Sequence, residues 1–452
     1  MQLVAYGAQD IYLTGNPQIT FFKVVYRRHT NFSMEAIEQT LDGTQDFNNS
    51  VSSTISRNGD LVYRMYVEHF VKLKSGASDG DAEVGVVNDY GSLLLKEVNL
   101  EIGGQQIDRH YGHWHAVYYK LTESNPNNKL ENIYDKMSGT GVGVNTNDDG
   151  GRAPSVDLIK KYKGWTISET ALEQTIQGRF FIPLNFWFCR NPGLALPLIA
   201  LQYHEVKVKI DIEAIDKLAF TAPTNGELAG SGSMTAGAGI SEKSFSLWCD
   251  YIYLDTDERR RFAQVSHEYL IEQVQYDSVS DTSVTNFNKQ LNFNHPVKEL
   301  IWASAPTDIL TNKPAVSGAS STINHQRAPV GPIDGKYLLK LNSQDRFKER
   351  DYRYFTRAQI WEHHTGNGGI ERGRNGTTAD PMVLKSDIIA VYSFALKPEE
   401  HQPSGTCNFS RIDNAELIRS DAITSVSQIN IYAINYNVLR IMSGMGGLAY
   451  SN

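Results

Sequence analysis

The sequence predicts an all-β protein built from antiparallel sandwiches or barrels, and three observations carry this prediction. Several segments alternate apolar and polar residues with a period of two, the pattern of a strand that has one face in a core and one in water. Few long segments show a helical period. Long stretches rich in Gly, Asn, Ser and Thr separate the alternating segments, and loops of this kind usually lie on an exposed surface.

The clearest strand pattern covers residues 204–213, where every second residue from Glu205 onward is charged and His, Val or Ile stands between. The same alternation is present at 61–73, 97–102 and 245–253. Asn58-Gly59, a dipeptide typical of type I′ turns, stands between 51–56 and 61–73 and predicts a tight turn between two strands. Short helices are expected at 257–264 and 193–202.

Two parts of the chain share an order of elements, which predicts an internal duplication. Residues 96–105 end in a turn before Asp108-Arg109, and residues 337–344 end in a turn before Asp345-Arg346. Two similar β domains explain this most simply. We expect an N-terminal arm at 1–18, a first domain at 19–256, a linker at 257–264 and a second domain at 265–452.

Composition and charge exclude several classes of protein. With 452 residues, 40% hydrophobic and 21% charged, the chain is long enough for two or three domains and too apolar to be disordered. A net charge of -8 argues against direct binding of nucleic acid. The most apolar stretch, 180–201, is broken by Asn, Arg, Pro and Gly, so we expect no membrane insertion.

The three cysteines are widely spaced and predict neither a disulfide framework nor a zinc site. Cys189 lies in an aromatic stretch and Cys249 in an alternating strand, so both are expected to be small buried apolar residues. The third is Cys407.

The strongest metal-site candidate is His110-x-x-His113-x-His115. A strand would place His113 and His115 on one face and His110 on the other, and no carboxylate or Cys completes the set, so structural roles are favoured. Asn145-x-Asn147-x-Asp149-Gly150 resembles the start of a calcium loop, but Val156 stands where a bidentate Glu is needed. We therefore expect no catalytic residue, no cofactor and no metal.

Three further features allow a role at the surface or at a domain joint. Arg259-Arg260-Arg261, flanked by acidic residues, predicts an ion-paired helix face between the domains. Asn375-Gly376-Thr377 is a glycan-acceptor motif and makes Asn375 the glycosylation candidate. Trp165 and Trp361 are either exposed aromatics suited to sugar binding or core residues.

Four blocks, in order along the chain, carry a family likeness. They begin Gln2-Leu3-Val4-Ala5-Tyr6-Gly7, Gly193-Leu194-Ala195-Leu196-Pro197, Gln402-Pro403-Ser404-Gly405-Thr406 and Asn435-Tyr436-Asn437-Val438-Leu439. Together they resemble the major capsid proteins of nucleocytoplasmic large DNA viruses, of the chlorella-virus (phycodnavirus) type.

The resemblance implies a double jelly roll, two tandem eight-stranded antiparallel β-sandwiches with long surface loops. It also implies a homotrimer, a pseudo-hexagonal capsomer that tiles an icosahedral shell beside neighbouring capsomers and minor capsid proteins. The location implied is the virion capsid, with assembly in the host cytoplasm. The apolar residues of the arm, Tyr6, Ile11, Tyr12 and Leu13, predict that it packs beneath the capsomer. Fold alone leaves two alternatives, a less abundant capsid paralogue and a glycan-binding attachment module; a β-sandwich hydrolase would lack an acid and base set.

Overall fold

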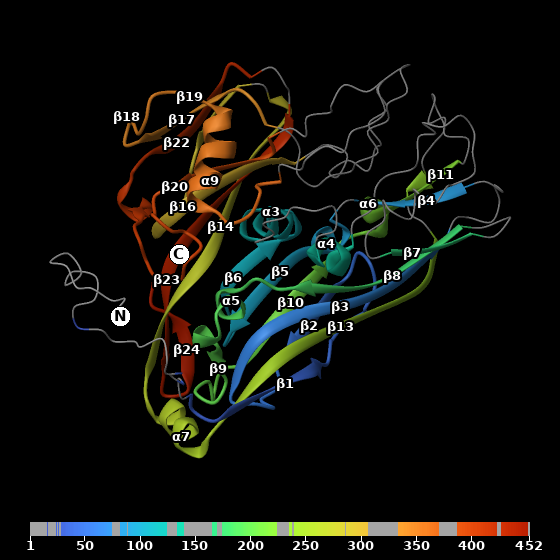
Figure 1. Cartoon of the computed structure of the whole chain (residues 1–452), viewed down its shortest axis with the longest axis vertical. Coiled ribbons are helices and arrows are strands. Elements are labelled where there is room, and N and C mark those ends of the chain that lie inside the picture. The colour runs from blue at the N-terminus through green and yellow to red at the C-terminus, as the bar shows by residue number, and fades with distance from the viewer. Residues whose placement is uncertain are drawn as a thin grey trace, which may run out of the picture.

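The computed structural model describes residues 29–74, 82–87, 89–123, 133–139, 165–169, 174–223, 235–236, 239–284, 286–305, 333–369, 387–422 and 426–450, with Asn16, Val24 and Tyr26. Asn375, the calcium-like segment 145–150 and the arm 1–18, apart from Asn16, lie outside the described residues. In the described part, two antiparallel β-sandwiches lie side by side (Figure 1).

The first sandwich is made of two sheets. Sheet 1A has the order β1 (Phe32–Gln39), β13 (Gly239–Leu254), β3 (Leu61–Lys74), β8 (Gln174–Pro183) and β7 (Trp165–Glu169), and β9 (Leu196–Pro197) also pairs with β3. Sheet 1B has the order β2 (Ser50–Thr54), β10 (Val206–Ile212), β5 (Leu95–Ile102) and β6 (Gln105–Tyr111). A small additional sheet contains β12 (Thr235–Ala236), β11 (Ala219–Pro223) and β4 (Ala82–Val86).

The second sandwich repeats this plan. Sheet 2A has the order β14 (His267–Val284), β23 (Val426–Met442), β16 (Pro296–Ala305) and β20 (Ile389–Ser393), extended by β21 (Cys407–Asn408) and β24 (Met445–Leu448). Sheet 2B has the order β15 (Phe287–Gln290), β22 (Ala415–Ser420), β17 (Lys336–Leu341) and β18 (Gln344–Asp345), and β19 (Arg350–Asp351) also pairs with β17.

The strand order identifies both sandwiches as jelly rolls. When the eight main strands of each are counted along the chain, one sheet runs first, eighth, third, sixth and the other second, seventh, fourth, fifth. The predicted double jelly roll is thus confirmed.

The predicted duplication appears directly in two hairpins. Gly103 and Gly104 join β5 to β6 with φ values of 59° and 81°, and Asn342 and Ser343 join β17 to β18 with φ values of 52° and 62°. Two successive positive φ angles are the signature of a type I′ turn, which matches the twist of the strands it connects. Segments 96–105 and 337–344, whose sequence patterns correspond, therefore occupy equivalent positions in the two sandwiches.

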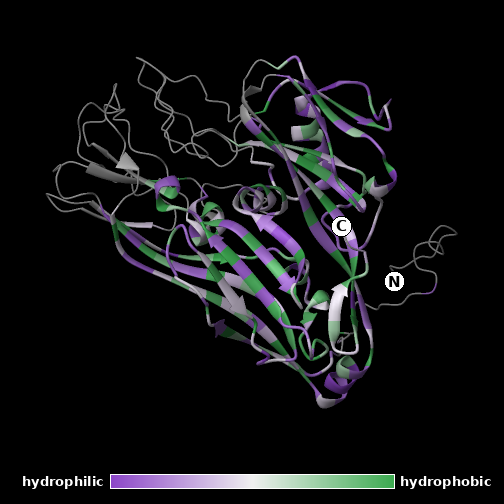
Figure 2. Cartoon of the chain, turned by 180° about the vertical axis from the view of Figure 1, so that it is seen from behind, coloured by the Kyte–Doolittle hydropathy of each residue, from purple (hydrophilic) through white to green (hydrophobic). Residues whose placement is uncertain are grey.

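Alternation along the strands builds the cores as the sequence predicts. In β10, Val206, Val208, Ile210 and Ile212 are buried between partly or fully exposed charged residues. Figure 2 shows the same banding of hydrophobic and hydrophilic residues along the strands of the first sandwich. One face of each sheet is therefore buried between the two sheets.

Two local predictions are wrong. Asn58-Gly59 does not close a type I′ hairpin, because neither residue has a positive φ and the strands on either side, β2 and β3, belong to different sheets. Residues 193–202 do not form an α-helix; they contain the 3₁₀ turn η1 (Pro192–Leu194) and β9, since Pro197 cannot donate a helical hydrogen bond.

The expected helix near 257–264 is confirmed as α7 (Thr256–Gln264). Asp255 caps it by accepting a hydrogen bond from the Thr256 amide, and Arg259 pairs with the buried carboxylate of Asp60 at 2.7 Å. The predicted ion pairing therefore holds for Arg259, whose partner is Asp60 of the first sandwich and not one of the flanking acidic residues.

The remaining helices are short, with one exception that the sequence did not reveal. They are α2 (Tyr90–Leu94), α4 (Ile133–Ser138), α5 (Trp187–Arg190), α6 (Ile215–Leu218), the π-helical η2 (Tyr354–Ala358) with α9 (Gln359–His363), and the 3₁₀ turn η3 (Phe409–Arg411). The exception is α3 (Gly112–Thr122), which is buried on several sides and so lacks the single apolar stripe that betrays a surface helix.

Candidate functional site: the joint between the two sandwiches

The three candidate histidines lie at the joint between the sandwiches, and their predicted placement is wrong. His110 lies in β6, whereas His113 and His115 belong to α3 and do not share a strand face. His113 Nδ1 lies 2.9 Å from the Tyr432 hydroxyl of the second sandwich. His110 Nε2 lies 3.0 Å from Asp108 Oδ2, inside the first sandwich.

His115 is a buried, neutral side chain. Burial, helped by neighbouring His110, lowers the pKa of His115 to about 3. In the part of the chain that the structure describes, no group of three or more His, Cys, Asp and Glu side chains is placed to hold a metal ion. The His110 and His115 rings pack on each other with centroids 5.6 Å apart, and the His113 ring packs on Tyr432 at 5.9 Å.

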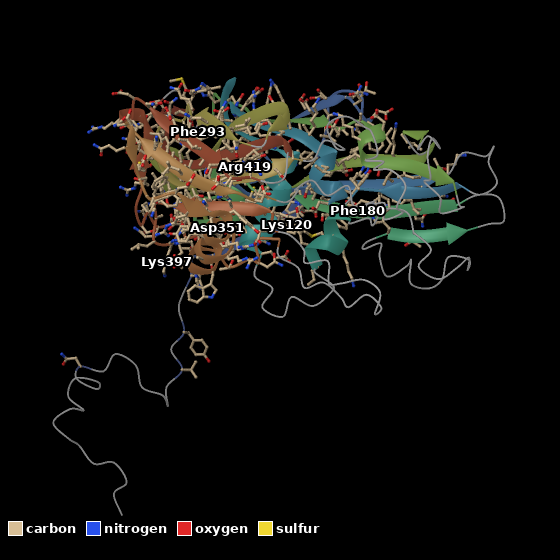
Figure 3. The ribbon with its side chains drawn as sticks, turned by 90° about the horizontal axis from the view of Figure 1, so that it is seen from above. Lys120, Phe180, Phe293, Asp351, Lys397 and Arg419 are labelled. Carbon is tan, nitrogen blue, oxygen red and sulfur yellow. The ribbon has the colours of Figure 1, made fainter. Side chains whose placement is uncertain are left out.

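Helix α3 makes one apolar contact between the sandwiches, and Ile271, Leu439 and Ile441 make another by joining the first core. Trp114, Val117 and Leu121 pack on the outer face of sheet 2A. The Trp114 ring centroid is 5.0 Å from that of Tyr432. In the view from above, Lys120 of this helix lies between Phe180 of the first sandwich and Arg419 of the second (Figure 3). Because Trp114 is completely buried, the helix stabilises the contact between the two sandwiches.

The second sandwich also supplies hydrogen bonds to the C-terminal end of α3. The last carbonyl groups of a helix have no partner within the helix. Here the Gly366 amide donates to the Leu121 carbonyl at 2.7 Å, and the Gly368 amide donates to the Lys120 carbonyl at 2.9 Å. Helix α3 therefore ends in a cap that its own sandwich does not provide.

A buried ionic cluster lies beside this cap. Arg190 of the first sandwich pairs with Glu272 at 2.6 Å, and Lys298 pairs with the same carboxylate at 2.9 Å. His364 adds a second part, since its Nε2 lies 3.0 Å from Glu299 and its Nδ1 lies 2.9 Å from Glu399.

The charges in this cluster balance. Arg190, Lys298 and His364 oppose Glu272, Glu299 and Glu399. Burial tends to lower the pKa of His364, but the charge of Glu299 and hydrogen bonds to both carboxylates raise it to about 9. Removal of one member would leave an uncompensated charge in this cluster, to which the first sandwich contributes Arg190.

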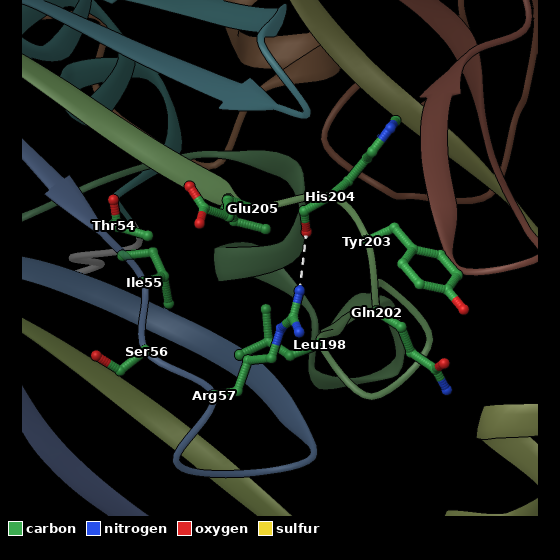
Figure 4. A pocket seen from close by; sticks show the side chains of 10 residues that line it. Thr54, Ile55, Ser56, Arg57, Leu198, Gln202, Tyr203, His204 and Glu205 are labelled. Carbon is green, nitrogen blue, oxygen red and sulfur yellow. Dashed lines mark hydrogen bonds between the residues drawn. The ribbon is translucent and has the colours of Figure 1, made fainter.

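A hollow at the opposite end of the joint is lined by Arg57, Leu198, Tyr203, His204 and their neighbours (Figure 4). Its volume is about 440 Å³. Arg57 donates to the Leu201 carbonyl at 2.6 Å and, more weakly, to the His204 carbonyl. His204 in turn contacts the Gly446 carbonyl of β24 at 2.8 Å. These polar groups hold a turn and a cross-sandwich contact.

The other singled-out residues fall into two environments. Trp165 is buried in the first core, whereas Trp361 on α9 is 85% exposed. Cys249 is buried as expected, and Cys189 is half-buried with its thiol pKa raised to about 12 by burial.

Sequence reasoning missed most of this joint. It singled out the histidines but not Trp114, the carboxylates or the capping glycines. The one available signal was the aromatic and histidine-rich run from Tyr111 to Tyr119, which reads equally well as a strand.

In the described residues, no helix is long and apolar enough to cross a membrane.

Comparisons with known proteins agree with this architecture. Residues 20–255 match the family described as major capsid protein N-terminus, and residues 258–447 match the large eukaryotic DNA virus major capsid protein family. The major capsid protein of Pyramimonas orientalis virus is 46% identical, and that of Paramecium bursaria Chlorella virus 1 is 41% identical; each alignment covers 100% of this chain and 99% of the relative.

Solved structures give the same result. The capsid protein in the quasi-atomic model of the PBCV-1 virus capsid has a TM-score of 0.68 and 36% identity, over 96% of this chain and 100% of that one. The Faustovirus major capsid protein has a TM-score of 0.65 at 14% identity, over 97% and 94%, which shows the shared fold. The resemblance to the chlorella-virus type is confirmed, and neither alternative function is favoured. The chain belongs to the family of large eukaryotic DNA virus major capsid proteins, whose role is structural, in the virion capsid, and not enzymatic.

Proposed function

We propose that three copies of this capsid protein form a homotrimer, a pseudo-hexagonal capsomer that tiles an icosahedral shell. The observation that supports this most is the duplication: two jelly rolls with the same strand order are fastened side by side in one chain. Three such chains around a threefold axis present six similar lobes, a shape that packs on a hexagonal lattice.

The test is the mass and shape of the purified protein. Multi-angle light scattering at micromolar concentration should give three times the chain mass, and electron microscopy should show six-lobed particles. A monomer mass across this range, with no trimer, would refute the proposal.

We propose that the chain divides at α7, with an arm at 1–18, jelly rolls at 19–256 and 265–452 and a linker at 257–264. The placement of the described strands on either side of α7 supports this division. Limited proteolysis that cut first within 257–264 and left two fragments associated through α3 would agree with it. Cleavage that destroyed either half as a folded unit would not.

We propose that capsomers contact neighbouring capsomers and minor capsid proteins, and that the arm 1–18 takes part beneath the capsomer. The apolar residues of this segment, such as Tyr6, Ile11 and Tyr12, support the proposal, because a short arm cannot bury them against itself. Deletion of residues 2–16 should leave trimers that melt at the normal temperature but assemble poorly into shells. Failure of the truncated chain to fold would instead place the arm in the domain core.

We propose Asn375 as a glycan carrier and the host cytoplasm as the place of assembly. Support for the glycan comes from the acceptor motif alone, Asn375-Gly376-Thr377. Mass spectrometry of protein from virions should show a mass increment on the peptide containing Asn375 that Asn375→Gln abolishes. Fractionation of infected cells should place newly formed trimers in the cytoplasm.

A further inference from the structure

Because the two sandwiches share a strand order, residues of one can be matched to equivalent residues of the other. In the first, Leu61 of β3 pairs with Pro197 of β9; in the second, Pro296 of β16 pairs with Asn408 of β21. Leu61 therefore corresponds to Pro296, and Tyr66 of β3 corresponds to Ile301 of β16. Their cross-strand partners correspond too: Trp248 pairs with Tyr66 and Tyr432 pairs with Ile301.

By the same correspondence, Phe181 of the first sandwich is equivalent to Ile389 of the second. Phe181 pairs with Glu68, and Ile389 pairs with Ala303, which corresponds to Glu68. Directly paired residues in an antiparallel sheet point to the same side. Tyr66, Phe181 and Trp248 thus lie on the outer face of sheet 1A, the counterpart of the outer face of sheet 2A.

In sheet 2A this outer face is covered. Ile301, Ile389 and Tyr432 are buried and pack, with neighbouring residues, against α3 of the first sandwich. The chain therefore already contains one copy of a specific interface, in which the helix of one jelly roll docks on the outer face of the next.

In sheet 1A the corresponding face is partly open. Phe181 is 38% exposed, and Tyr66 and Trp248 are half-buried. The three rings pack together: Tyr66 stacks on Trp248 with ring centroids 6.4 Å apart, and it meets Phe181 edge-on with centroids 6.1 Å apart. We call Tyr66, Phe181 and Trp248 the aromatic face.

Edge strand β1 extends the aromatic face. Glu38 pairs with Trp248, so alternate residues back along β1 point to the same side. Among them Phe32 is 56% exposed and Met34 is 47% exposed. An exposed apolar surface that continues over adjacent strands marks an interaction site.

Among the residues that the structure describes, no sandwich is docked on the outer side of one helix of the second sandwich, η2 with α9. η2 and α9 follow β19 and precede β20, just as α3 follows β6 and precedes β8. Arg353, Arg357 and Trp361, spaced four apart, are exposed along this helical segment, and Trp361 is 85% exposed. Trp and Arg are the residue types most enriched at the energetic centres of protein interfaces.

We propose that Trp361 and its helix dock on the aromatic face of a second copy of this chain, repeating between chains the contact that α3 makes within one. The inference rests on the proposed homotrimer and names its interface. Such a head-to-tail contact joins two different surfaces and closes after three chains, because each chain contributes two of six similar sandwiches. Asp250 lies on the same outer face as Trp248 and offers a carboxylate to Arg353. Glu68 and Arg357 are already paired within the chain, with Arg179 and Asp387.

Cysteine cross-linking tests the pairing directly. In a Cys407→Ser background, Trp361→Cys and Phe181→Cys combined in one chain should give covalent dimers and trimers on oxidation. The two single variants should cross-link when mixed, and neither alone should do so. Cross-links within Trp361→Cys alone would place this residue against its own copy on the threefold axis and would overturn the inference.

Substitution provides the second test. Trp361→Ala and Phe181→Ser should each raise the protein concentration at half-dissociation of the trimer at least tenfold, as expected for a central interface residue. Tyr203→Ala, an exposed aromatic elsewhere, is the matched control and should leave it unchanged. The isolated monomer should melt normally in all three, because these side chains are at the surface.

The outcomes separate the two proposals. If the wild-type chain forms no trimer, the homotrimer itself is wrong. If wild-type trimers form but neither cross-link between the two sites nor weakening by Trp361→Ala is found, the trimer stands and the interface named here is wrong.

Discussion

His364 and Glu299 face each other across 3.0 Å inside the joint, with each side chain at most 3% exposed. The other ring nitrogen of His364 faces Glu399 at 2.9 Å. A neutral imidazole has only one N–H, so a ring with a carboxylate at each nitrogen is satisfied only as the imidazolium ion. This residue carries a fixed positive charge into the contact between the sandwiches.

The pH dependence of stability should follow from that charge. The raised pKa of His364, about 9 against an ordinary 6.5, means that its contribution is complete below about pH 6.5 and is lost as the pH rises through about 9. Burial raises the pKa of Glu299 but the His364 charge outweighs it and lowers the pKa below 4.5, so the Glu299 contribution is lost as the pH falls through the acid range. Melting temperature should therefore be highest between these limits.

His364→Gln should remove the alkaline loss and cost stability on the order of 3 kcal/mol near pH 6. Thermal denaturation followed from pH 5 to 10 measures both. His363→Gln is the control, because His363 contacts the Leu396 carbonyl and no buried carboxylate. An alkaline decline of equal steepness in wild type and His364→Gln would contradict the assignment.

Trp114→Ala should loosen the joint without unfolding either sandwich. Loss of a fully buried Trp costs about 3–5 kcal/mol. Because Trp114 packs between the sandwiches, calorimetry should resolve one transition into two. Trp302→Ala removes a side chain of similar burial within the second core alone and should lower that sandwich's own transition. A single cooperative transition in Trp114→Ala would show that α3 does not couple the two units.

Gly103 and Gly104 provide a matched pair in one turn. Both have positive φ, so Ala at either position should cost about 1–2 kcal/mol. A Cβ at Gly103 would also come within 2.3 Å of His204 Nδ1, whereas one at Gly104 would meet nothing within 4 Å. Gly103→Ala should therefore destabilise further, by about 1–3 kcal/mol, as His204 is displaced from the Gly446 carbonyl. Equal free energies of unfolding for the two variants would disprove this contact.

Asp60 should stabilise α7 and the end of β13. Its carboxylate accepts from the Leu254 amide at 2.9 Å and from Arg259 at 2.7 Å. Asp60→Ala leaves the half-buried Leu254 amide unpaired and should cost about 1–3 kcal/mol. Arg260→Ala, on the exposed side of the same helix, should change stability by less than about 0.5 kcal/mol in denaturant titrations. A cost for Arg260→Ala as large as that for Asp60→Ala would indicate a different role for this helix.

Features that depend on local pattern could be predicted from the sequence. Alternation in Val206, Val208 and Ile210 predicts β10, because a strand places alternate side chains on opposite faces whatever lies next to it. The run of acidic residues and arginines after Asp255 predicts α7, because capping and charge act within one turn. Correspondence of Gly103-Gly104 with Asn342-Ser343 likewise depends only on turn geometry.

The sequence by itself thus determined the strands, the duplication and, through four matching blocks, the family. Only the tertiary structure decided which surfaces meet. Asn58-Gly59 carries a hairpin signal, yet β2 and β3 join different sheets, because the partner of a strand is chosen by burial over the whole sandwich. The roles of His113, His364 and Trp114 depend on residues more than 30 positions away, such as Tyr432 and Glu399, and no local pattern encodes such a distance. The exposure of Trp361 likewise depends on which residues pack against α9 once the chain has folded.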